Sequence, residues 1–372
     1  NNNYCKAQYK LGMIYYDDKY IKHDIDKAIS YFLSAANQND SQAQYYLGEI
    51  YYCNRFVECN ISKAINYFLL SANQNNSKAQ FYLGVIYLLD LYVPKNISKA
   101  LFYFQLSANN GFVLSQYNLG FLYKEGKDVT RDDKKAIHYL SLAAKQGYIP
   151  ANFLLVSIYF NGYQVPRDIP KAAYYFKICA DNDIPEAHFN LGVIYYFGDG
   201  IQRDINKSIY HYIKAANLNY SEALYNLALI YYEGKYVKHD INTFLHYLIL
   251  SANQNNPEAQ NNLGTIYYQG KFVPRDRNKA FYYFSLAAKQ NHPIALFNVG
   301  LLHLKKKSFQ DHKEGIKLIS LAFIKGEKQA AFVLGYLYHE GKYIKCDIAK
   351  SIHYYKEASS FNSQYAKNNF GI

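Results

Sequence analysis

Small and apolar residues recur along the chain at helical spacing, in pairs of short runs. In residues 41–76 they fall three or four apart from Ala43 to Tyr51 and again, after a short gap, from Ala64 to Ala72. That spacing places side chains on one face of an α-helix. The pattern predicts two consecutive amphipathic helices, called helix A and helix B, which pack antiparallel across a short connection.

The helix pair returns every 36 residues, and once after 35. A glycine of helix A marks most repeats, and Val156 and Ala228 occupy its place twice. The marker glycines are Gly12, Gly48, Gly84, Gly120, Gly192, Gly264, Gly300 and Gly335. We predict a single repeat array over 1–372. Its ten repeats, numbered one to ten, lie near 5–40, 41–76, 77–112, 113–148, 149–184, 185–220, 221–256, 257–292, 293–327 and 328–363, with a partial eleventh over 364–372.

Capping residues mark the ends of the predicted helices. Asp or Asn begins every helix B, where a short acceptor binds exposed N–H groups for ~1 kcal/mol each. These N-caps are Asp24, Asn60, Asn96, Asp132, Asp168, Asp204, Asp240, Asp276, Asp311 and Asp347. Residues that tolerate left-handed backbone follow nearly every helix. They are Asp18, Asn54, Asp90, Gly126, Gly162, Gly198, Gly234, Gly270 and Gly341 after helix A, with Lys306 as the exception, and Asn39, Asn75, Gly111, Gly147, Asp183, Asn219, Asn255, Asn291, Gly326 and Asn362 after helix B.

Glycine and tyrosine together suggest how the helices pack. A glycine inside a helix costs ~1 kcal/mol relative to alanine, so its return implies a close approach by another helix. Tyrosines recur with the same period in both helices, for example Tyr51 and Tyr67. We expect these rings to fill the space over the small residues. A packing role therefore accounts for the tyrosine stripe better than a cofactor site.

Repeat six carries the clearest family resemblance. The run Ala187–Tyr196, the Gly198-Asp-Gly200 turn, Asp204–Lys207 and Ala215-Ala216 are similar to the Sel-1-like repeat, a relative of the tetratricopeptide repeat. The resemblance covers essentially the whole chain. It implies an all-α, right-handed superhelical solenoid of antiparallel helix pairs that serves as a protein-binding scaffold, with no catalytic residues to transfer.

Repeat nine departs most from this pattern. It has His303 in place of the helix A tyrosine, Lys306 at the cap position, Gly315 in place of the helix B alanine and one residue fewer in its connection. We interpret these changes as sequence drift without a specific role. A local kink or a recognition feature in repeat nine stays open.

Family relatives display helix A on the inner curve of their superhelix. The candidate binding surface is therefore the arc of helix A opposite its packing residues. This helix A arc comprises the positions two before, one after and five after the marker glycine. Its candidate protein-binding residues are Asn118, Phe121, Glu125, Asn190, Phe197, Asn226, Glu233, Asn262, Gln269 and Asn298. The asparagine row could hold an extended peptide backbone. A solvated face, or bonds to the neighbouring repeat, explains it equally well.

Charge narrows the class of partner. The chain has 41 Lys and Arg against 29 Asp and Glu, a net charge of +12. The helix A arc nevertheless holds two bases, Lys10 and Lys305, against five acids. A groove that neutralises phosphates should be basic, so the arc disfavours nucleic acid. The excess lies on a basic ridge at the start of helix B, formed by Lys27, Lys63, Lys99, Lys135, Lys171, Lys207, Lys279 and Lys350 with Arg131, Arg167, Arg203 and Arg275. It could attract an acidic partner or a membrane surface, although solvated lysines are the commoner explanation.

No motif for catalysis, a cofactor or a metal is evident. The sequence contains no phosphate-binding glycine loop, no His-Glu-x-x-His and no paired cysteines at zinc spacing. Five irregularly placed cysteines do not suggest a disulfide framework and favour a reducing compartment. No apolar run is long enough to span a membrane. We expect neither enzymatic activity in this segment nor a cofactor.

The resulting hypothesis is a non-catalytic scaffold or adaptor, cytoplasmic, that binds a protein or peptide along its inner, helix A face. One alternative is the targeting arm of a larger enzyme such as a protein kinase. Another is a lumenal subunit of an ER-associated degradation complex, which would require a preceding signal peptide. RNA binding through the basic ridge is a further alternative. The sequence leaves the partner and the oligomeric state open.

Overall fold

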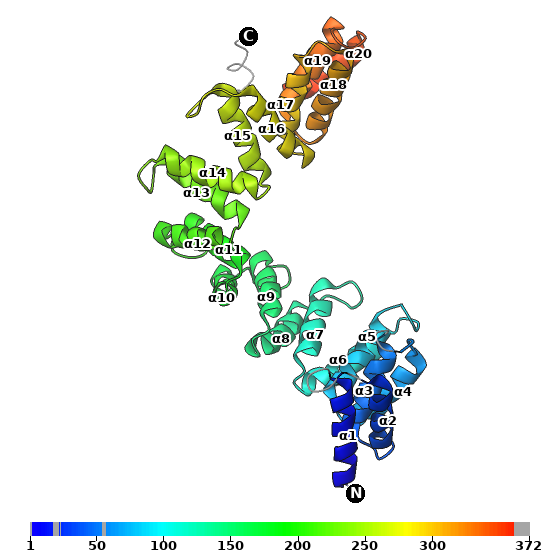
Figure 1. The fold of residues 1–372 in the computed structure, drawn as a ribbon. Helices are drawn as coiled ribbons and strands as arrows, with labels where there is room; N and C mark the ends of the chain where they lie inside the picture. Colours follow the sequence, from blue (N-terminus) through cyan, green and yellow to red (C-terminus); the bar gives the residue numbers. More distant parts are fainter. Residues whose placement is uncertain (1, 18–21, 23, 54–56, 361–372) are drawn as a thin grey trace. The chain divides into compact units, whose positions relative to one another are not determined.

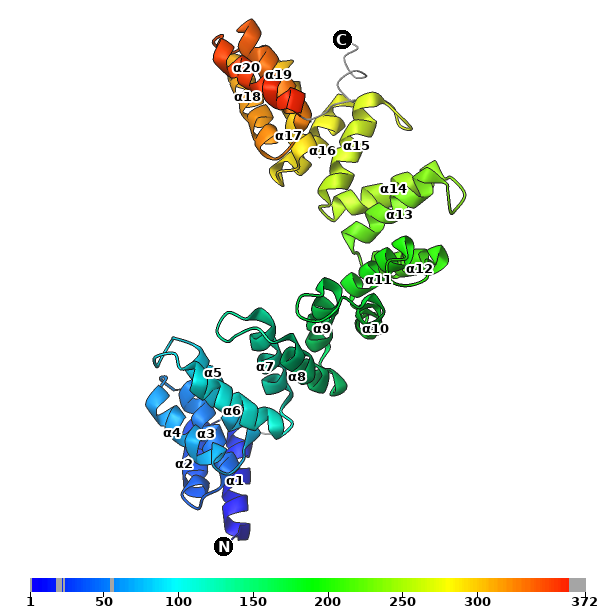
Figure 2. The ribbon, with the colours of Figure 1, turned by 180° about the vertical axis from the view of Figure 1, so that it is seen from behind.

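The computed structural model of the chain describes residues 2–17, 22, 24–53 and 57–360. These residues form twenty α-helices and no strand, which confirms the all-α prediction. The helices succeed one another in pairs along the chain (Figures 1 and 2). Odd-numbered helices correspond to helix A and even-numbered helices to helix B.

Two compact units make up the chain, residues 1–179 and 180–372. The first contains α1 (Asn2–Tyr16), α2 (Ile25–Ala36), α3 (Ser41–Tyr52), α4 (Ile61–Ala72), α5 (Ser77–Leu88), α6 (Ile97–Asn109), α7 (Val113–Glu125), α8 (Asp133–Lys145), α9 (Ile149–Asn161) and nearly all of α10 (Ile169–Ala180). The second contains α11 (Pro185–Phe197), α12 (Ile205–Asn217), α13 (Ser221–Glu233), α14 (Ile241–Asn253), α15 (Pro257–Gln269), α16 (Arg277–Lys289), α17 (Pro293–Leu304), α18 (Phe309–Ile324), α19 (Lys328–Glu340) and α20 (Ile348–Ser360).

The marker glycines lie directly against side chains of helix B, which confirms the predicted close approach. A Cβ added at Gly48 would lie 2.6 Å from Cδ1 of Phe68, and one added at Gly264 would lie 2.5 Å from Cδ1 of Phe284. Both rings are buried. The prediction that the recurring helix B tyrosines, such as Tyr67, cover these glycines is wrong, because the covering side chain belongs to the next residue. That residue is Phe in four repeats, Tyr212 and Tyr355 in two, and Leu140 and Ile319 in two.

The tyrosines of the two helices instead stack on one another. In repeat two the rings of Tyr51 and Tyr67 are stacked with their centroids 6.0 Å apart. The same stacked pair recurs as Tyr15–Tyr31, Tyr87–Tyr103, Tyr123–Tyr139, Tyr159–Tyr175, Tyr231–Tyr247, Tyr267–Tyr283 and Tyr338–Tyr354. The stripe therefore holds helix A to helix B at the edge of each core, as offset aromatic pairs do.

A column of buried amides joins successive repeats. The amide of Gln260 donates to the carbonyl of Ala252 at 3.1 Å, and that of Gln290 donates to Gln260 Oε1 at 2.9 Å. In repeat six the buried His188 stands in this column, with its Nδ1 3.0 Å from Nδ1 of His211. Burial, and then the charge of Lys214, lower the pKa of His188.

The helix ends agree with the sequence at most positions. Side-chain oxygens of the predicted N-caps accept backbone N–H bonds in every repeat except nine. After helix A, the predicted glycines have left-handed backbone at Gly126, Gly162, Gly198, Gly234, Gly270 and Gly341. After helix B, every predicted residue from Asn39 to Gly326 does. Asp18, Asn54 and Asn362 lie outside the described residues.

Two predicted caps are wrong. Leu89 ends α5 with extended backbone, so Asp90 does not adopt the left-handed conformation. The N-cap of α18 is Ser308, whose hydroxyl accepts the N–H of Asp311 at 3.0 Å. Asp311 lies in the first turn, because the shorter connection lets this helix begin earlier.

Candidate functional site

A solvent-open pocket of about 160 Å³ lies between α11, α12 and α13 in the second compact unit. Five residues of its lining belong to the helix A arc of repeats six and seven, namely Val193, Phe197, Asn226, Leu229 and Glu233. The other lining residues are Tyr196, Tyr212 and Ile230. The structure thus brings the predicted Phe197, Asn226 and Glu233 together around one hollow.

Phe197 is the main apolar feature of this pocket. It is the last residue of α11, and 70% of its side chain is exposed. Gly198 follows in left-handed backbone and ends the helix. Such an exposed ring beside Val193 and Leu229 provides a contact surface for an apolar side chain.

The floor of the pocket is polar but already bonded. Burial raises the pKa of the Tyr212 phenol to about 12, and the neighbouring Asn226 and Ser208 side chains partly oppose this rise. The Ser208 hydroxyl donates to the Gly192 carbonyl at 2.7 Å. Asn226 thus lines the pocket next to the buried Tyr212 phenol.

The rim carries charge and further aromatic surface. Arg203 lies over the rings of Tyr196 and Tyr236, 5.6 and 5.3 Å from their centroids, and it hydrogen-bonds the Tyr236 hydroxyl. The bond from Arg203, and then that from Lys235, lower the pKa of Tyr236. Burial, followed by the nearby Glu233 charge, raises the pKa of Tyr196.

The other predicted asparagines are half-buried and bond mostly to the protein itself. Asn190 donates to the Glu186 carbonyl at 2.8 Å. Asn262 donates to the Tyr225 hydroxyl at 3.1 Å, and Asn298 donates to Asn261 Oδ1 at 3.4 Å. Bonds within the protein thus use one donor of each amide. An asparagine side chain also has a second N–H and an acceptor oxygen for a partner.

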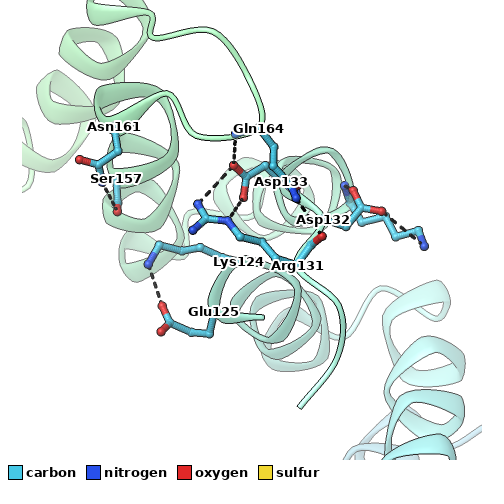
Figure 3. Close-up of polar contacts among 9 residues, drawn as sticks. Lys124, Glu125, Arg131, Asp132, Asp133, Ser157, Asn161 and Gln164 are labelled. Atoms are coloured by element: carbon cyan, nitrogen blue, oxygen red, sulfur yellow. Dashed lines mark hydrogen bonds and ion pairs between the residues drawn. The ribbon is translucent and has the colours of Figure 1, made fainter. Parts of the chain in front are cut away.

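The remaining predicted residues do not line this pocket. Asn118, Phe121 and Glu125 lie on α7 in the first compact unit, where Phe121 stacks on Tyr117 and Glu125 pairs with Lys124 at 2.8 Å (Figure 3). Gln269 is exposed at the end of α15.

One polar cluster escaped the sequence analysis. The carboxylate of Asp133 is fully buried and lies 2.8 Å from Nε of Arg131, and it accepts the backbone N–H of Gln164 at 3.2 Å (Figure 3). Gln164 Oε1 accepts the N–H of Asp133 at 3.0 Å. The sequence signal for this cluster was the pair of acids Asp132-Asp133, because the helix cap needs only one of them. The cluster ties the connections of repeats four and five together.

The basic ridge is largely occupied by the protein's own aromatic rings. Lys207 Nζ lies 5.3 Å from the Tyr195 centroid and 3.4 Å from the Asp204 carboxylate. Each of the other ridge cations also lies over an aromatic ring. Cation–π contacts of this kind contribute ~0.5–1 kcal/mol at exposed sites. The ridge thus has a structural role that the sequence analysis did not foresee.

Metal-ligating clusters and membrane-spanning helices are both absent from the part of the chain that the structure describes. It contains no group of three or more His, Cys, Asp or Glu side chains that could hold a metal ion. None of the described helices combines the length and the apolar character that a membrane span requires. None of Cys5, Cys53, Cys59, Cys179 and Cys346 forms a disulfide within the described residues.

Comparisons with known proteins agree with the repeat. The model of the Sel1 repeat matches residues 5–40, 41–76, 77–112, 113–148, 150–183, 185–220, 221–256, 257–292 and 328–360. Its matches leave out repeat nine. No curated protein matches the sequence.

Two solved structures are similar over most of the chain. One is a protective antigen of uropathogenic Escherichia coli strains displaying an SLR fold, with 28% identity, a TM-score of 0.76 and coverage of 95% of this chain and 76% of the other. The second is a Sel1 repeat protein from Oxalobacter formigenes, with 29% identity, a TM-score of 0.69 and coverage of 82% and 88%.

Proposed function

The chain belongs to the Sel1 repeat family, and from this premise we propose that it binds a protein partner through the pocket between α11 and α13. Sel1 repeat proteins are generally protein-interaction scaffolds, and their solenoid fold is typically non-catalytic. The observation that carries the proposal is the exposed Phe197 beside Val193 and Leu229, with the polar Asn226 and Glu233 on the same hollow.

The pocket suits one apolar side chain of a partner, flanked by polar contacts. Side chains that pack into small hollows dominate binding energy, and the exposed Phe197 ring would contact such a side chain of the partner. Glu233 and the unused amide and carbonyl groups of the asparagine row can bond the partner's backbone. The partner segment would lie across helices α11 and α13, whose arcs carry these residues.

A quantitative pull-down tests this proposal. The wild-type chain is compared with the double variant Phe197→Ser, Leu229→Ser, and with the control Phe102→Ser, Leu70→Ser, which alters two exposed apolar residues of helix B. We expect one or more proteins to be lost from the first variant and retained by the control. Binding of each such protein is then measured calorimetrically with purified components.

Asn226 requires separate treatment because it lies next to the buried Tyr212 phenol and affects its pKa. Asn190→Ala and Asn262→Ala therefore test the asparagine row, and circular dichroism checks that each variant folds. If every partner survives both the apolar and the asparagine changes, the pocket is not the binding site.

A further inference from the structure

Repeat nine forms a second, larger hollow in the second compact unit. This groove, about 570 Å³ in volume, lies between the start of α18 and the connection that follows α19. Phe309, Ile316 and Ile344 supply apolar surface, and Lys313 and Lys345 stand at its sides. It shares no residue with the pocket between α11 and α13.

The altered start of α18 produces this groove. Ser308 caps the helix early, and Asp311 is held in the first turn by His303 at 2.9 Å and Lys306 at 3.1 Å. Phe309 therefore becomes the first helical residue, and 76% of its side chain is exposed. In the regular repeats the connection runs on to an Asp or Asn cap at the corresponding place.

The opposite wall comes from the connection after α19. Tyr343 has left-handed backbone, with φ of +68°, and its ring lies 4.0 Å from the His312 ring, centroid to centroid. A bulky residue rarely adopts this conformation. The packing of Tyr343 on His312 holds the connection against α18 and places Ile344 and Lys345 beside the groove.

The lysines of the groove differ from those of the basic ridge. Lys171 and Lys207 pair with the caps Asp168 and Asp204 at 2.8 and 3.4 Å, and each also lies over a tyrosine ring. Among the described residues, Lys313 and Lys345 have neither a carboxylate within ion-pair distance nor an aromatic ring beneath them. Their two charges are available at the sides of an apolar groove.

We propose that this groove binds an acidic peptide segment of a partner protein, with one large apolar side chain seated between Phe309, Ile316 and Ile344. Lys313 and Lys345 would pair with carboxylates on either side of that residue. Charge complementarity determines the choice of occupant, because an apolar peptide without acids would leave both lysines unpaired. This binding does not depend on the pocket between α11 and α13.

Fluorescence anisotropy with the full chain tests the proposal. The probe is a labelled peptide of Asp and Glu residues with one central Phe, and two matched peptides carry Ala in place of Phe or Lys in place of the acids. We expect the acidic Phe peptide to bind tightest, to weaken with added salt, and to lose about tenfold in affinity to Lys313→Glu, Lys345→Glu. The variant Lys134→Glu, Lys177→Glu, with the same change in net charge, should bind it as the wild type does.

Three results would overturn the proposal. The first is no binding of the acidic Phe peptide, or equal binding to both charge variants. The second is binding of the Ala peptide as tight as that of the acidic Phe peptide, which would show that the groove attracts negative charge without seating an apolar side chain. The third is a concentration-dependent dimer in sedimentation that Phe309→Ser abolishes, which would assign the groove to a second copy of the chain. Circular dichroism and the thermal midpoint of each variant show whether it has folded.

Discussion

Repeats eight and nine are neighbours in the chain and build their helix pairs differently. In repeat eight, Tyr267 stacks on Tyr283 at 5.8 Å and Lys279 lies over the Tyr267 ring. In repeat nine, His303 and Leu318 occupy the places of these tyrosines, and His303 bonds Asp311 instead.

What the two repeats share is a glycine of helix A pressed against helix B. The added Cβ would meet Phe284 at Gly264 and Ile319 at Gly300. The close helix contact is therefore the requirement of the fold, and the aromatic edge is one of several ways to complete it.

The largest effect is expected at Gly300. A Cβ there would lie 2.6 Å from Ile319 Cγ1 and 2.9 Å from the Gly315 carbonyl oxygen, which belongs to the backbone and cannot rotate away. Gly300→Ala should therefore cost about 3 kcal/mol and Gly264→Ala, which meets only a ring, about 1–2 kcal/mol. Urea unfolding monitored by circular dichroism measures both. Equal costs in the two repeats would show that the backbone contact is unimportant.

Breaking the amide column should lower the free energy of unfolding by less than Gly300→Ala does. Gln260→Leu removes two hydrogen bonds, the one to the Ala252 carbonyl, which keeps the N–H of Asn255, and the one from the Gln290 amide, and should lower the free energy of unfolding by about 2 kcal/mol. Repeat nine has Leu296 and Lys325 at the two corresponding positions. The double variant Gln260→Leu, Gln290→Lys should thus be more stable than the single one. A further loss in the double variant would contradict this account.

The cap of α18 should give a smaller effect that depends on pH. Ser308→Ala should cost ~1 kcal/mol, as for other N-caps. Bonds from Ser308, and then from Lys306, lower the pKa of Asp311 to about 2 from its ordinary 3.8. The stability that this carboxylate contributes is therefore complete above about pH 4 and is lost as the pH falls towards about 2. Thermal midpoints across this range should fall less steeply for Asp311→Asn than for the wild type.

The smallest effect is expected at His188 in repeat six. Its lowered pKa keeps the ring neutral in the fold, so its contribution to stability is complete above its ordinary pKa of 6.5 and falls below it. The facing His211 and the nearby Lys214, Asp181 and Asp183 share this environment. His188→Gln gives repeat six the amide that Gln260 provides in repeat eight. The thermal midpoint of this variant should change less than that of the wild type between about pH 7.5 and about pH 5.5. If the thermal midpoints of the variant and the wild type change equally between these pH values, His188 is not the source of the pH dependence.

Most of the fold could be predicted from the sequence because each part of it is repeated. Gly48, Asn60 and Asn75 each occupy positions with one dominant physical role, and ten copies of the pattern make that role clear. Ser308 was missed because Asp311 stands at the expected cap position, and only the shorter connection decides between them. The left-handed backbone of Tyr343 was not foreseen from its residue type, although Gly200 and Phe272, which also lie two residues after the glycine that ends helix A, adopt the same conformation.

The candidate site was predictable in part for the same reason. A helical wheel locates Phe197, Asn226 and Glu233 on one arc, and the structure brings them around one pocket. Whether that arc binds a partner stays a prediction. Tyr212 was not predicted as part of the site, because the wheel describes helix A and Tyr212 lies on α12, a helix B.

The stacked tyrosine pairs also give the protein an optical signature. The chain has 43 tyrosines and no tryptophan, so its near-ultraviolet spectrum is dominated by tyrosine. Parallel rings at the distance of Tyr267 and Tyr283 couple their electronic transitions, and the coupling disappears when the helices separate. Repeat nine contributes no such pair and contains no tyrosine. Near-ultraviolet circular dichroism can therefore follow the melting of the tyrosine-paired repeats without a label.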